Sequence, residues 1–437
     1  MALMDHINFL HGTIVLGALI AFFVVLRKRP LNPVIWFYLL FSFYFSSANL
    51  GNRSLIFPSG DELEYLLYGI LLIISFSIGA LLCSLIMSRN GPLPIHLNNA
   101  YELKPYLYSA IIVMLIFSPL LLIEMIYAVK AWGAGMNYGE TRSYVLSHRL
   151  VSNPGLIISL CLTFFYVVSK RKWPLLVFSV IILFFLMIGE RRDAAIAILA
   201  FIFFYYAVEP WRQSKRFLPA VIIILMMLAT AYGHIRSVLF SDITEVPVRF
   251  LEQTSENPIG LLMPLDSGEF FNIAAVSKSG YILFDGEYNF GANYVSAVYS
   301  IMPIIGRWPL MDTLPSAERL SDKYGESLVR QGLIGGTGGV AFGIDAYFAF
   351  GSIGAGVIFL IFGFSLFFFY RRALRSNIFV RFAYASALPI IVLHAGRSSI
   401  ESVVPNLIKI NLLPFISILM IGLFLKLLKS DSVEKKT

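Results

Sequence analysis

Long runs of apolar residues, separated by short polar connections, dominate the pattern along this chain. A helix rises about 1.5 Å per residue, so about 20 apolar residues cross the hydrocarbon core of a bilayer. Inside lipid every backbone amide must be paired within its own segment, so these runs predict helices and not open sheet. The pattern predicts an all-α integral membrane protein with about eleven spans, at 8–26, 31–50, 65–87, 106–128, 153–169, 173–188, 194–208, 217–233, 346–369, 378–395 and 405–427.

Every second connection between these spans is basic. The positive-inside rule places Lys and Arg in cytoplasmic connections. The alternation therefore predicts an outside N-terminus and a cytoplasmic C-terminus, which an odd number of spans satisfies. The basic connections lie at 27–29, 89–104, 170–172, 212–216 and 371–375, and the basic tail at 426–436.

One polar insertion of about 110 residues, 234–345, interrupts the apolar pattern. It divides the chain into an N-terminal bundle of about eight helices (1–233), an outer loop (234–345), and about three C-terminal helices with a short tail (346–437). Residues 270–276 and 294–303 are apolar but too short to span, so they are expected to pack against the bundle or lie in the interface. We expect a compact cap of short helices over the membrane mouth. A transporter rarely needs such a domain, whereas an enzyme acting on lipid-linked substrates does.

Composition supports the membrane interpretation. Hydrophobic residues make up 58% of the chain and charged residues 14%, against about a quarter in a soluble domain. The net charge of +8 comes mostly from helix ends, so it does not indicate a nucleic-acid partner. Cys83 and Cys161 both fall inside predicted helices, which argues against a disulfide framework or a metal site.

The most informative polar cluster is the sequence GERRD at 189–193, between two apolar runs. Charges at membrane depth are costly and suggest function. Arginine binds phosphate through a planar fork and keeps its proton, so Arg191 and Arg192 are candidate pyrophosphate ligands. The alternative is a solvated hairpin tip with internal arginine–carboxylate pairs. The flanking runs are interpreted as two short spans, although half-helices meeting within the membrane are the alternative.

Two further groups lie near predicted outer helix ends. His234 and Arg236 follow the eighth span, and His234 has a pKa suited to a general base, although a lone histidine there is more often structural. Arginines of the outer loop, including Arg330, form a possible cationic basin for a pyrophosphate, although each alone is more often a surface arginine. The second group lies at residues 394–401, in the short connection before the last predicted span.

In that second group Arg397 is a candidate phosphate ligand, and Glu401 and His394 are candidate acid–base residues. Lys409, just inside the last span, either binds the pyrophosphate or extends its ammonium to the interface. Arg142, His148 and Arg149 form a weaker outer group that is more typical of an ordinary loop; they are separate from these candidates.

A glycine-rich run at 332–343 leads into the ninth span. Its partial match to a dinucleotide-binding fingerprint fails, because no strand precedes it and no βαβ unit surrounds it. Flexible backbone over a binding mouth is the better interpretation, with Asp345 at the start of the next helix as a candidate catalytic acid or base.

Three features together resemble a known family: GERRD between two short spans, the large outer loop, and GGTGGVAFGIDAYFAFGSIGAG entering the next span. The chain resembles the bacterial O-antigen and oligosaccharide repeat-unit polymerases, the Wzy-type enzymes, which are relatives of the O-antigen ligases. The resemblance implies a glycosyltransferase C-like fold in the bacterial inner membrane. It also implies transfer of a growing glycan from undecaprenyl pyrophosphate to the next undecaprenyl-pyrophosphate-linked repeat unit at the periplasmic face.

The resemblance further implies a metal-independent glycosyltransferase without a cofactor. Its implied partners are the lipid-linked oligosaccharides, a Wzz-type chain-length regulator and a Wzx-type flippase, and not nucleic acid. The family's arginine after a glycine corresponds to Arg191 or Arg192, and its acidic residue ahead of an aromatic corresponds to Asp345 before Tyr347. The histidine-containing loop motif of ligase-like relatives is not clearly present, which leaves a histidine base open.

Two other functions remain alternatives. A ligase would carry out the same chemistry on a lipid A core acceptor, and sequence alone does not separate it from a polymerase. A transporter or flippase of lipid-linked oligosaccharide usually shows internal repeats or paired broken helices, and neither is visible in this sequence.

Overall fold

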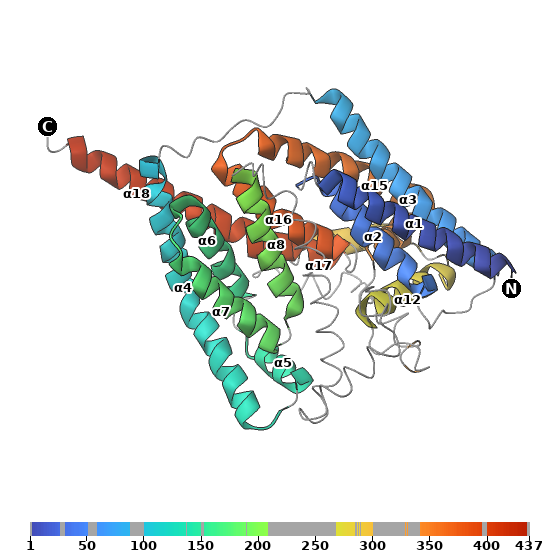
Figure 1. The fold of residues 1–437 in the computed structure, drawn as a ribbon, viewed down its shortest axis with the longest axis horizontal. Helices are drawn as coiled ribbons and strands as arrows, with labels where there is room; N and C mark the ends of the chain where they lie inside the picture. The colour runs from blue at the N-terminus through green and yellow to red at the C-terminus, as the bar shows by residue number, and fades with distance from the viewer. Residues whose placement is uncertain are drawn as a thin grey trace. The chain divides into compact units, whose positions relative to one another are not determined.

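A computed structural model provides the structure of the chain. It describes residues 2–26, 31–50, 59–87, 100–136, 138–149, 153–188, 190–208, 268–284, 290–299, 341–395 and 400–434, with single positions at 286, 288, 328 and 330. Every regular element in these ranges is a helix (Figure 1). The all-α class predicted from the apolar runs is therefore confirmed for the described residues.

The chain divides into two compact units. Unit 1 comprises residues 1–90, 211–372 and 391–405, and unit 2 comprises 91–210, 373–390 and 406–437. These units follow packing and not position relative to a membrane, so the three-part division at 233 and 345 remains a prediction about topology.

Unit 1 is built from helices at both ends of the sequence. Its N-terminal helices are α1 (Ala2–Leu26), α2 (Pro33–Leu50) and α3 (Ser59–Ile86). They are joined by α12 (Gly268–Ile282), α13 (Ala292–Tyr299), most of α15 (Phe342–Leu374) and α17 (Ile400–Asn406). Helix α1 packs along α2, and α12 packs against α2 and α3.

Helix α12 is a buried part of unit 1. Residues 273–280 are all buried, and they include Lys278, whose ammonium pairs with Glu62 of α3 at 2.6 Å. A buried charge is tolerated only when it is paired, so this contact ties α12 to α3. Of the two placements expected for the apolar stretch 270–276, packing against the bundle is the one observed. The expected cap over the membrane mouth stays a prediction.

Unit 2 contains α4 (Ala100–Gly133), α5 (Tyr138–Ser147), α6 (Pro154–Ser169), α7 (Trp173–Ile188) and α8 (Arg191–Val208). Residues 378–390 of α16 (Ile378–Ala395), the π-helical turn η6 (Leu407–Leu412) and α18 (Leu413–Glu434) complete it. Helix α6 lies at the centre, because it contacts α4, α7 and α8. Its residues 154–165 are all buried, which accounts for its nearly continuous apolar sequence.

Among the described residues, four helices are long and apolar enough to cross a membrane: Asp61–Ile86, Leu103–Gly133, Phe342–Leu374 and Val403–Leu428. They coincide with the predicted spans at 65–87, 106–128, 346–369 and 405–427. Five more predicted spans correspond to shorter apolar helices, and the span at 194–208 lies within α8. The span at 217–233 lies outside the described residues, so the total of eleven remains a prediction.

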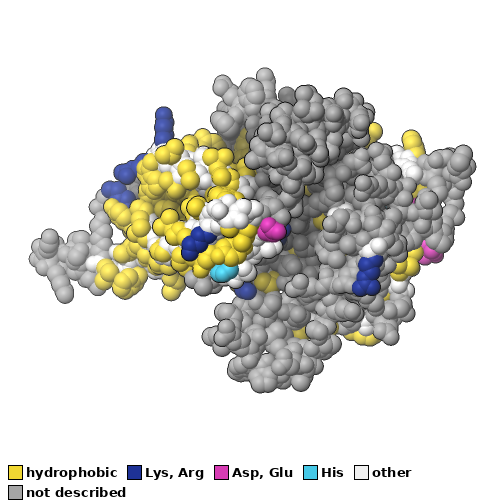
Figure 2. Space-filling view, turned by 90° about the horizontal axis from the view of Figure 1, so that it is seen from below, with side chains coloured by type: hydrophobic (Ala, Val, Ile, Leu, Met, Phe, Trp, Pro, Cys, Tyr) yellow, Lys and Arg dark blue, Asp and Glu magenta, His cyan; other side chains and the backbone are white. Residues whose placement is uncertain are grey.

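The exposed surface agrees with a lipid environment. Hydrophobic side chains cover most of the described part of the face drawn in Figure 2, and basic side chains occupy a few separate places on it. Both cysteines are buried and unpaired, Cys83 in α3 and Cys161 in α6, as their predicted positions inside helices implied.

Candidate functional site

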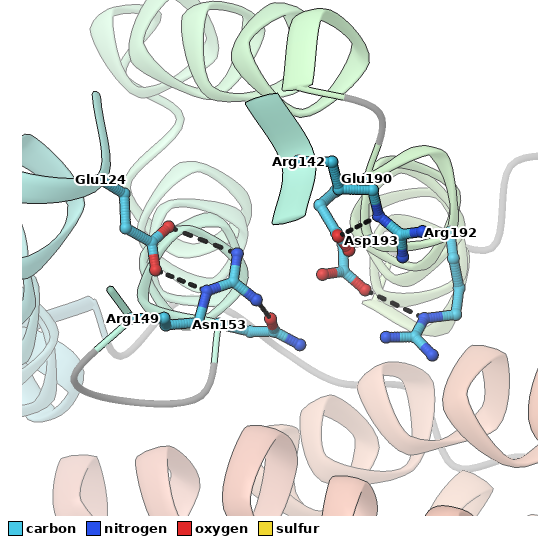
Figure 3. Close-up of polar contacts among 7 residues, drawn as sticks. All are labelled: Glu124, Arg142, Arg149, Asn153, Glu190, Arg192 and Asp193. Carbon is cyan, nitrogen blue, oxygen red and sulfur yellow. Dashed lines mark hydrogen bonds and ion pairs between the residues drawn. The ribbon is translucent and has the colours of Figure 1, made fainter. Parts of the chain in front are cut away.

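Seven polar residues gather at one end of the unit 2 bundle (Figure 3). They come from the C-terminal part of α4, from α5 and the α5–α6 connection, from the α7–α8 connection and from the first turn of α8. We call this set the arginine–carboxylate cluster. Its members are Glu124, Arg142, Arg149, Asn153, Glu190, Arg192 and Asp193.

Local sequence explains how this end of the bundle is built. Asn153 adopts a left-handed conformation (φ 53°, ψ 55°), which asparagine tolerates better than most residues, and Pro154 then opens α6. After α7, the Glu190 amide donates to the carbonyl of Phe185, and the Glu190 carbonyl accepts from Asp193 and Ala194. These bonds turn the chain directly into α8 and bring Asp193, in its first turn, within the electrostatic influence of Arg149.

Arg149 is fully engaged inside the protein. Its Nε donates to Glu124 Oε1 at 2.6 Å, its Nη2 reaches Glu124 Oε2 at 3.4 Å, and its Nη1 donates to Asn153 Oδ1. The Arg149 side chain is 11% exposed and that of Glu124 is 3% exposed. All three guanidinium nitrogens therefore serve to join α4 to the start of α6, and Arg149 is a positioning residue.

Arg142 and Arg192 are held differently. Arg142 donates through Nε to Glu190 Oε1 at 2.9 Å, and Arg192 donates through Nε to Asp193 Oδ1 at 3.2 Å. These side chains are 45% and 29% exposed, respectively. In each ion pair only Nε contacts the carboxylate, and the two terminal nitrogens, Nη1 and Nη2, take no part in the pair. A guanidinium held in this way presents its fork, the geometry that matches a phosphate.

The pKa values of Glu190, in the α7–α8 connection, and of Asp193, in the first turn of α8, are shifted in opposite directions. Burial opposes ionisation of Glu190, but Arg142, Arg149 and Arg192 outweigh it and lower the pKa of Glu190. Burial raises the pKa of Asp193 to about 6, with the charge of Glu190 adding to the rise and Arg192 opposing it. Asp193 Oδ2 is buried and has no hydrogen-bond partner. Protonation of Asp193 below about pH 6 therefore leaves the cluster more positive.

The structure brings only one of the predicted pyrophosphate ligands into this cluster with its side chain described. That residue is Arg192; Arg191 begins α8, but its side chain lies outside the described residues. The internal arginine–carboxylate pairs that the sequence offered as the alternative are present, and the ligand role of Arg192 stays a prediction. Lys409 lies in η6 and is half-buried, and Arg330 is an exposed helical position.

Asp345 lies in unit 1 and is fully buried. Its Oδ2 accepts a hydrogen bond of 3.0 Å from the amide of Ile400, the first residue of α17. A carboxylate at a helix N-terminus satisfies an otherwise unpaired amide and interacts favourably with the helix dipole. The observed contact of Asp345 is thus structural, and its catalytic role stays a prediction.

The remaining predicted residues are not placed. His234, Arg236 and Arg397 lie outside the described residues, as do the side chains of His394 and Glu401. The predicted convergence of Arg191, Arg192, Arg236 and Arg397 therefore stays a prediction.

Sequence reasoning assigned Arg142 and Arg149 to an ordinary loop and did not consider Glu124 or Asn153. One signal pointed to them: Glu124 is a lone carboxylate inside the apolar run 106–128, and a charge at that depth needs a partner. That signal does not identify the partner, because Lys130 is the nearest cation in sequence and Arg142 and Arg149 lie beyond it. Only the fold shows that Arg149 takes this partner and that Arg142 takes Glu190.

Comparison with known proteins gives one result. The family model described as O-antigen polysaccharide polymerase Wzy matches residues 1–428. No curated protein and no solved structure matches the chain.

Proposed function

Because this chain belongs to the family of Wzy O-antigen polysaccharide polymerases, we propose that it elongates a glycan on undecaprenyl pyrophosphate at the periplasmic face of the inner membrane. Family membership makes it a multi-pass inner-membrane protein that polymerises lipid-linked oligosaccharide repeat units. The match across residues 1–428 is the observation that carries the reaction class. The identity of the lipid carrier, the periplasmic face and the metal-independent mechanism belong to the proposal.

In the proposed reaction the acceptor hydroxyl attacks the anomeric carbon of the donor glycan. The new glycosidic bond forms as the bond from that carbon to the pyrophosphate oxygen breaks. Undecaprenyl pyrophosphate leaves with the bonding electron pair, and the hydroxyl proton passes to a base. The barrier depends strongly on stabilising the charge that develops on the leaving oxygen.

We assign that stabilisation to Arg142 and Arg192. Their Nε atoms are held by buried carboxylates, so the guanidinium planes are fixed before substrate binds, while their terminal nitrogens are directed away from those pairs. Preorganised donors of this kind lower a barrier without paying for reorganisation during the reaction. Arg149 supports the site by holding α4 to α6, as its three contacts indicate.

The proposal retains the other sequence-based candidates in their roles. Arg191, Arg236, Arg330, Arg397 and Lys409 are proposed to contribute to binding of the donor and acceptor pyrophosphates. The base is proposed to be one of His234, Asp345 and Glu401. The Wzz-type regulator and the Wzx-type flippase are proposed partners.

The arginine assignment is tested by chain-length profiling of Arg142→Ala and Arg192→Ala, with protein level in the membrane measured for each variant. Loss of a preorganised donor is expected to slow polymerisation by about 10²- to 10³-fold. The corresponding lysine variants should recover only part of the rate, because lysine keeps the charge but loses the fork. Arg171→Ala is the matched control, since Arg171 is exposed in the α6–α7 connection, at the other end of α6.

Normal ladders from well-expressed Arg142→Ala and Arg192→Ala variants would contradict the site but leave the family unchanged. The reaction class has its own test. Deletion of the gene should leave surface lipid that carries one repeat unit and no ladder. Loss of the single-repeat species as well would indicate a ligase or a flippase.

A further inference from the structure

Three tyrosines with partly exposed rings lie together in unit 1, well separated in sequence from the arginine–carboxylate cluster. Tyr281 lies in the last turn of α12, Tyr288 follows that helix, and Tyr347 lies in the first turns of α15. The ring centroids of Tyr281 and Tyr347 are 4.6 Å apart. Phe284 connects Tyr347 to Tyr288, at centroid distances of 5.3 and 5.0 Å. The tyrosines therefore form one continuous aromatic surface.

Contacts with buried residues of unit 1 hold this aromatic surface in place. The buried ring of Tyr68 stacks on Tyr281 at 5.0 Å, and its hydroxyl donates to the carbonyl of Gly343. Helix α15 is kinked at Gly351, which has φ 70° and ψ −176°, a backbone conformation that favours glycine. A Cβ at Gly351 would lie 3.3 Å from the Tyr288 hydroxyl, so the absence of a side chain lets Tyr288 lie against the helix.

Two polar side chains, those of Ser352 and Glu64, act on Tyr281. The Ser352 side chain, next to the kink, hydrogen-bonds with Tyr281. Burial raises the pKa of Tyr281, and the negative charge of the exposed Glu64 on α3 raises it further. The hydrogen bond from Ser352 opposes these two effects, but the pKa of Tyr281 is raised overall, so its phenol stays protonated and able to donate, while the Glu64 carboxylate can accept.

We propose that Tyr281, Tyr288 and Tyr347, with Glu64 and Ser352, form a carbohydrate-binding subsite for one uncharged pyranose ring of the glycan. A pyranose has a face of C–H groups, which carry partial positive charge, and it has hydroxyls around its rim. The C–H face complements the negative face of an aromatic ring, and the rim hydroxyls complement phenol, serine and carboxylate groups. This proposal rests on the proposed function in one respect, which is that the bound sugar belongs to the repeat unit.

Charge distinguishes this surface from a pyrophosphate site. The negative charge of Glu64 acts on Tyr281, and it repels an anion. The arginine–carboxylate cluster presents guanidinium forks instead. The two surfaces are thus suited to the neutral and the anionic parts of a lipid-linked oligosaccharide, respectively.

A simple lipid contact is the alternative, because aromatic residues are common at membrane interfaces. The later part of α15 shows what lipid-facing sequence looks like in this unit: Ile353, Val357 and Ile361 are exposed and purely hydrocarbon. The surface around Tyr281 instead combines phenols, a hydroxyl and a carboxylate. That combination favours a hydroxylated ligand over acyl chains.

The test uses the full-length protein in nanodiscs and the phosphate-free oligosaccharide released by mild acid from the host's own lipid-linked repeat unit. Binding is measured by saturation-transfer NMR and by titration. Tyr288→Ala and Tyr281→Ala should each weaken binding about tenfold, the upper range for loss of one aromatic contact. Tyr288→Phe, which keeps the ring, should retain most of the affinity and shows that the site folds. Glu64→Gln should weaken binding by a smaller factor.

Tyr108→Ala is the matched control, because Tyr108 is a 60% exposed tyrosine on α4 in the other unit. Saturation should pass mainly to C–H protons on one face of a single pyranose. The subsite is wrong if the wild-type protein does not bind the oligosaccharide, or if Tyr288→Ala and Tyr108→Ala bind equally. It is also wrong if Tyr288→Ala changes only lipid association. None of these results alters the chain-length test of Arg142 and Arg192.

Discussion

Removing Arg149 should destabilise the protein far more than removing Arg142, although both arginines pair with buried carboxylates. Arg149→Met deletes three hydrogen-bond donors and leaves Glu124, whose side chain is 3% exposed, without its cation. Breaking one side of a buried pair costs about 3–5 kcal/mol, because an uncompensated buried charge remains. Arg142 is 45% exposed, and Glu190 also lies within the field of Arg149 and Arg192. Arg142→Met should therefore cost about 1 kcal/mol or less.

The cost of Arg149→Met should be recovered by removing its partner's charge. In the double variant Glu124→Gln, Arg149→Met, the buried charge is absent, and replacement of a whole buried pair is often neutral or stabilising. The double variant should regain most of the lost stability. Its rate of polymerisation per folded molecule should stay below that of the wild type, because the contacts through which Arg149 holds α4 to the start of α6 are still absent.

Stability is measured by denaturant titration in mixed micelles with tryptophan fluorescence, and activity by ladder formation from the same preparations. An Arg149→Met variant that unfolds at the wild-type midpoint would contradict this prediction, since Glu124 would then need no partner. A double variant that is no more stable than Arg149→Met would contradict it as well, and would mean that the methionine itself disrupts packing.

Three further outcomes are expected. Asp193 has a pKa raised to about 6, so it is protonated below that pH and ionised above it. The KM for the lipid-linked donor should rise as the pH increases through about 6, and a profile from pH 5 to 8 should lose that step in Asp193→Asn. A Cβ at Gly79 or Gly363 would meet the backbone carbonyl of Leu360 or Phe76, respectively, so valine at either position should lower the unfolding midpoint. Gly17→Val should not, because nothing lies near its Cβ position. Reporter fusions near residue 285 should report the periplasm, and a cytoplasmic signal there would overturn the proposed site of catalysis.

The sequence by itself determined the helical membrane class and the positions of the long spans. Both follow from a local requirement, because each backbone amide in lipid must be paired within its own segment. The GERRD sequence also stood out locally, since charge between two apolar runs is costly wherever the helices pack. The overall resemblance to the polymerase family was likewise readable from layout alone, and the family match confirms it.

Only the tertiary structure decided which charges meet. Glu124 and Arg149 are 25 residues apart, and Arg142 and Glu190 are 48 residues apart, so no helical spacing predicts either pair. The separate roles proposed for the three arginines depend on which guanidinium nitrogens are already bonded, and these bonds follow from how α4, α5, α6 and α8 meet. The same holds for the tyrosine surface: Tyr288 approaches α15 because the helix is kinked at Gly351. Long-range packing sets these contacts, and the residue pattern along the chain does not show which distant residues come together.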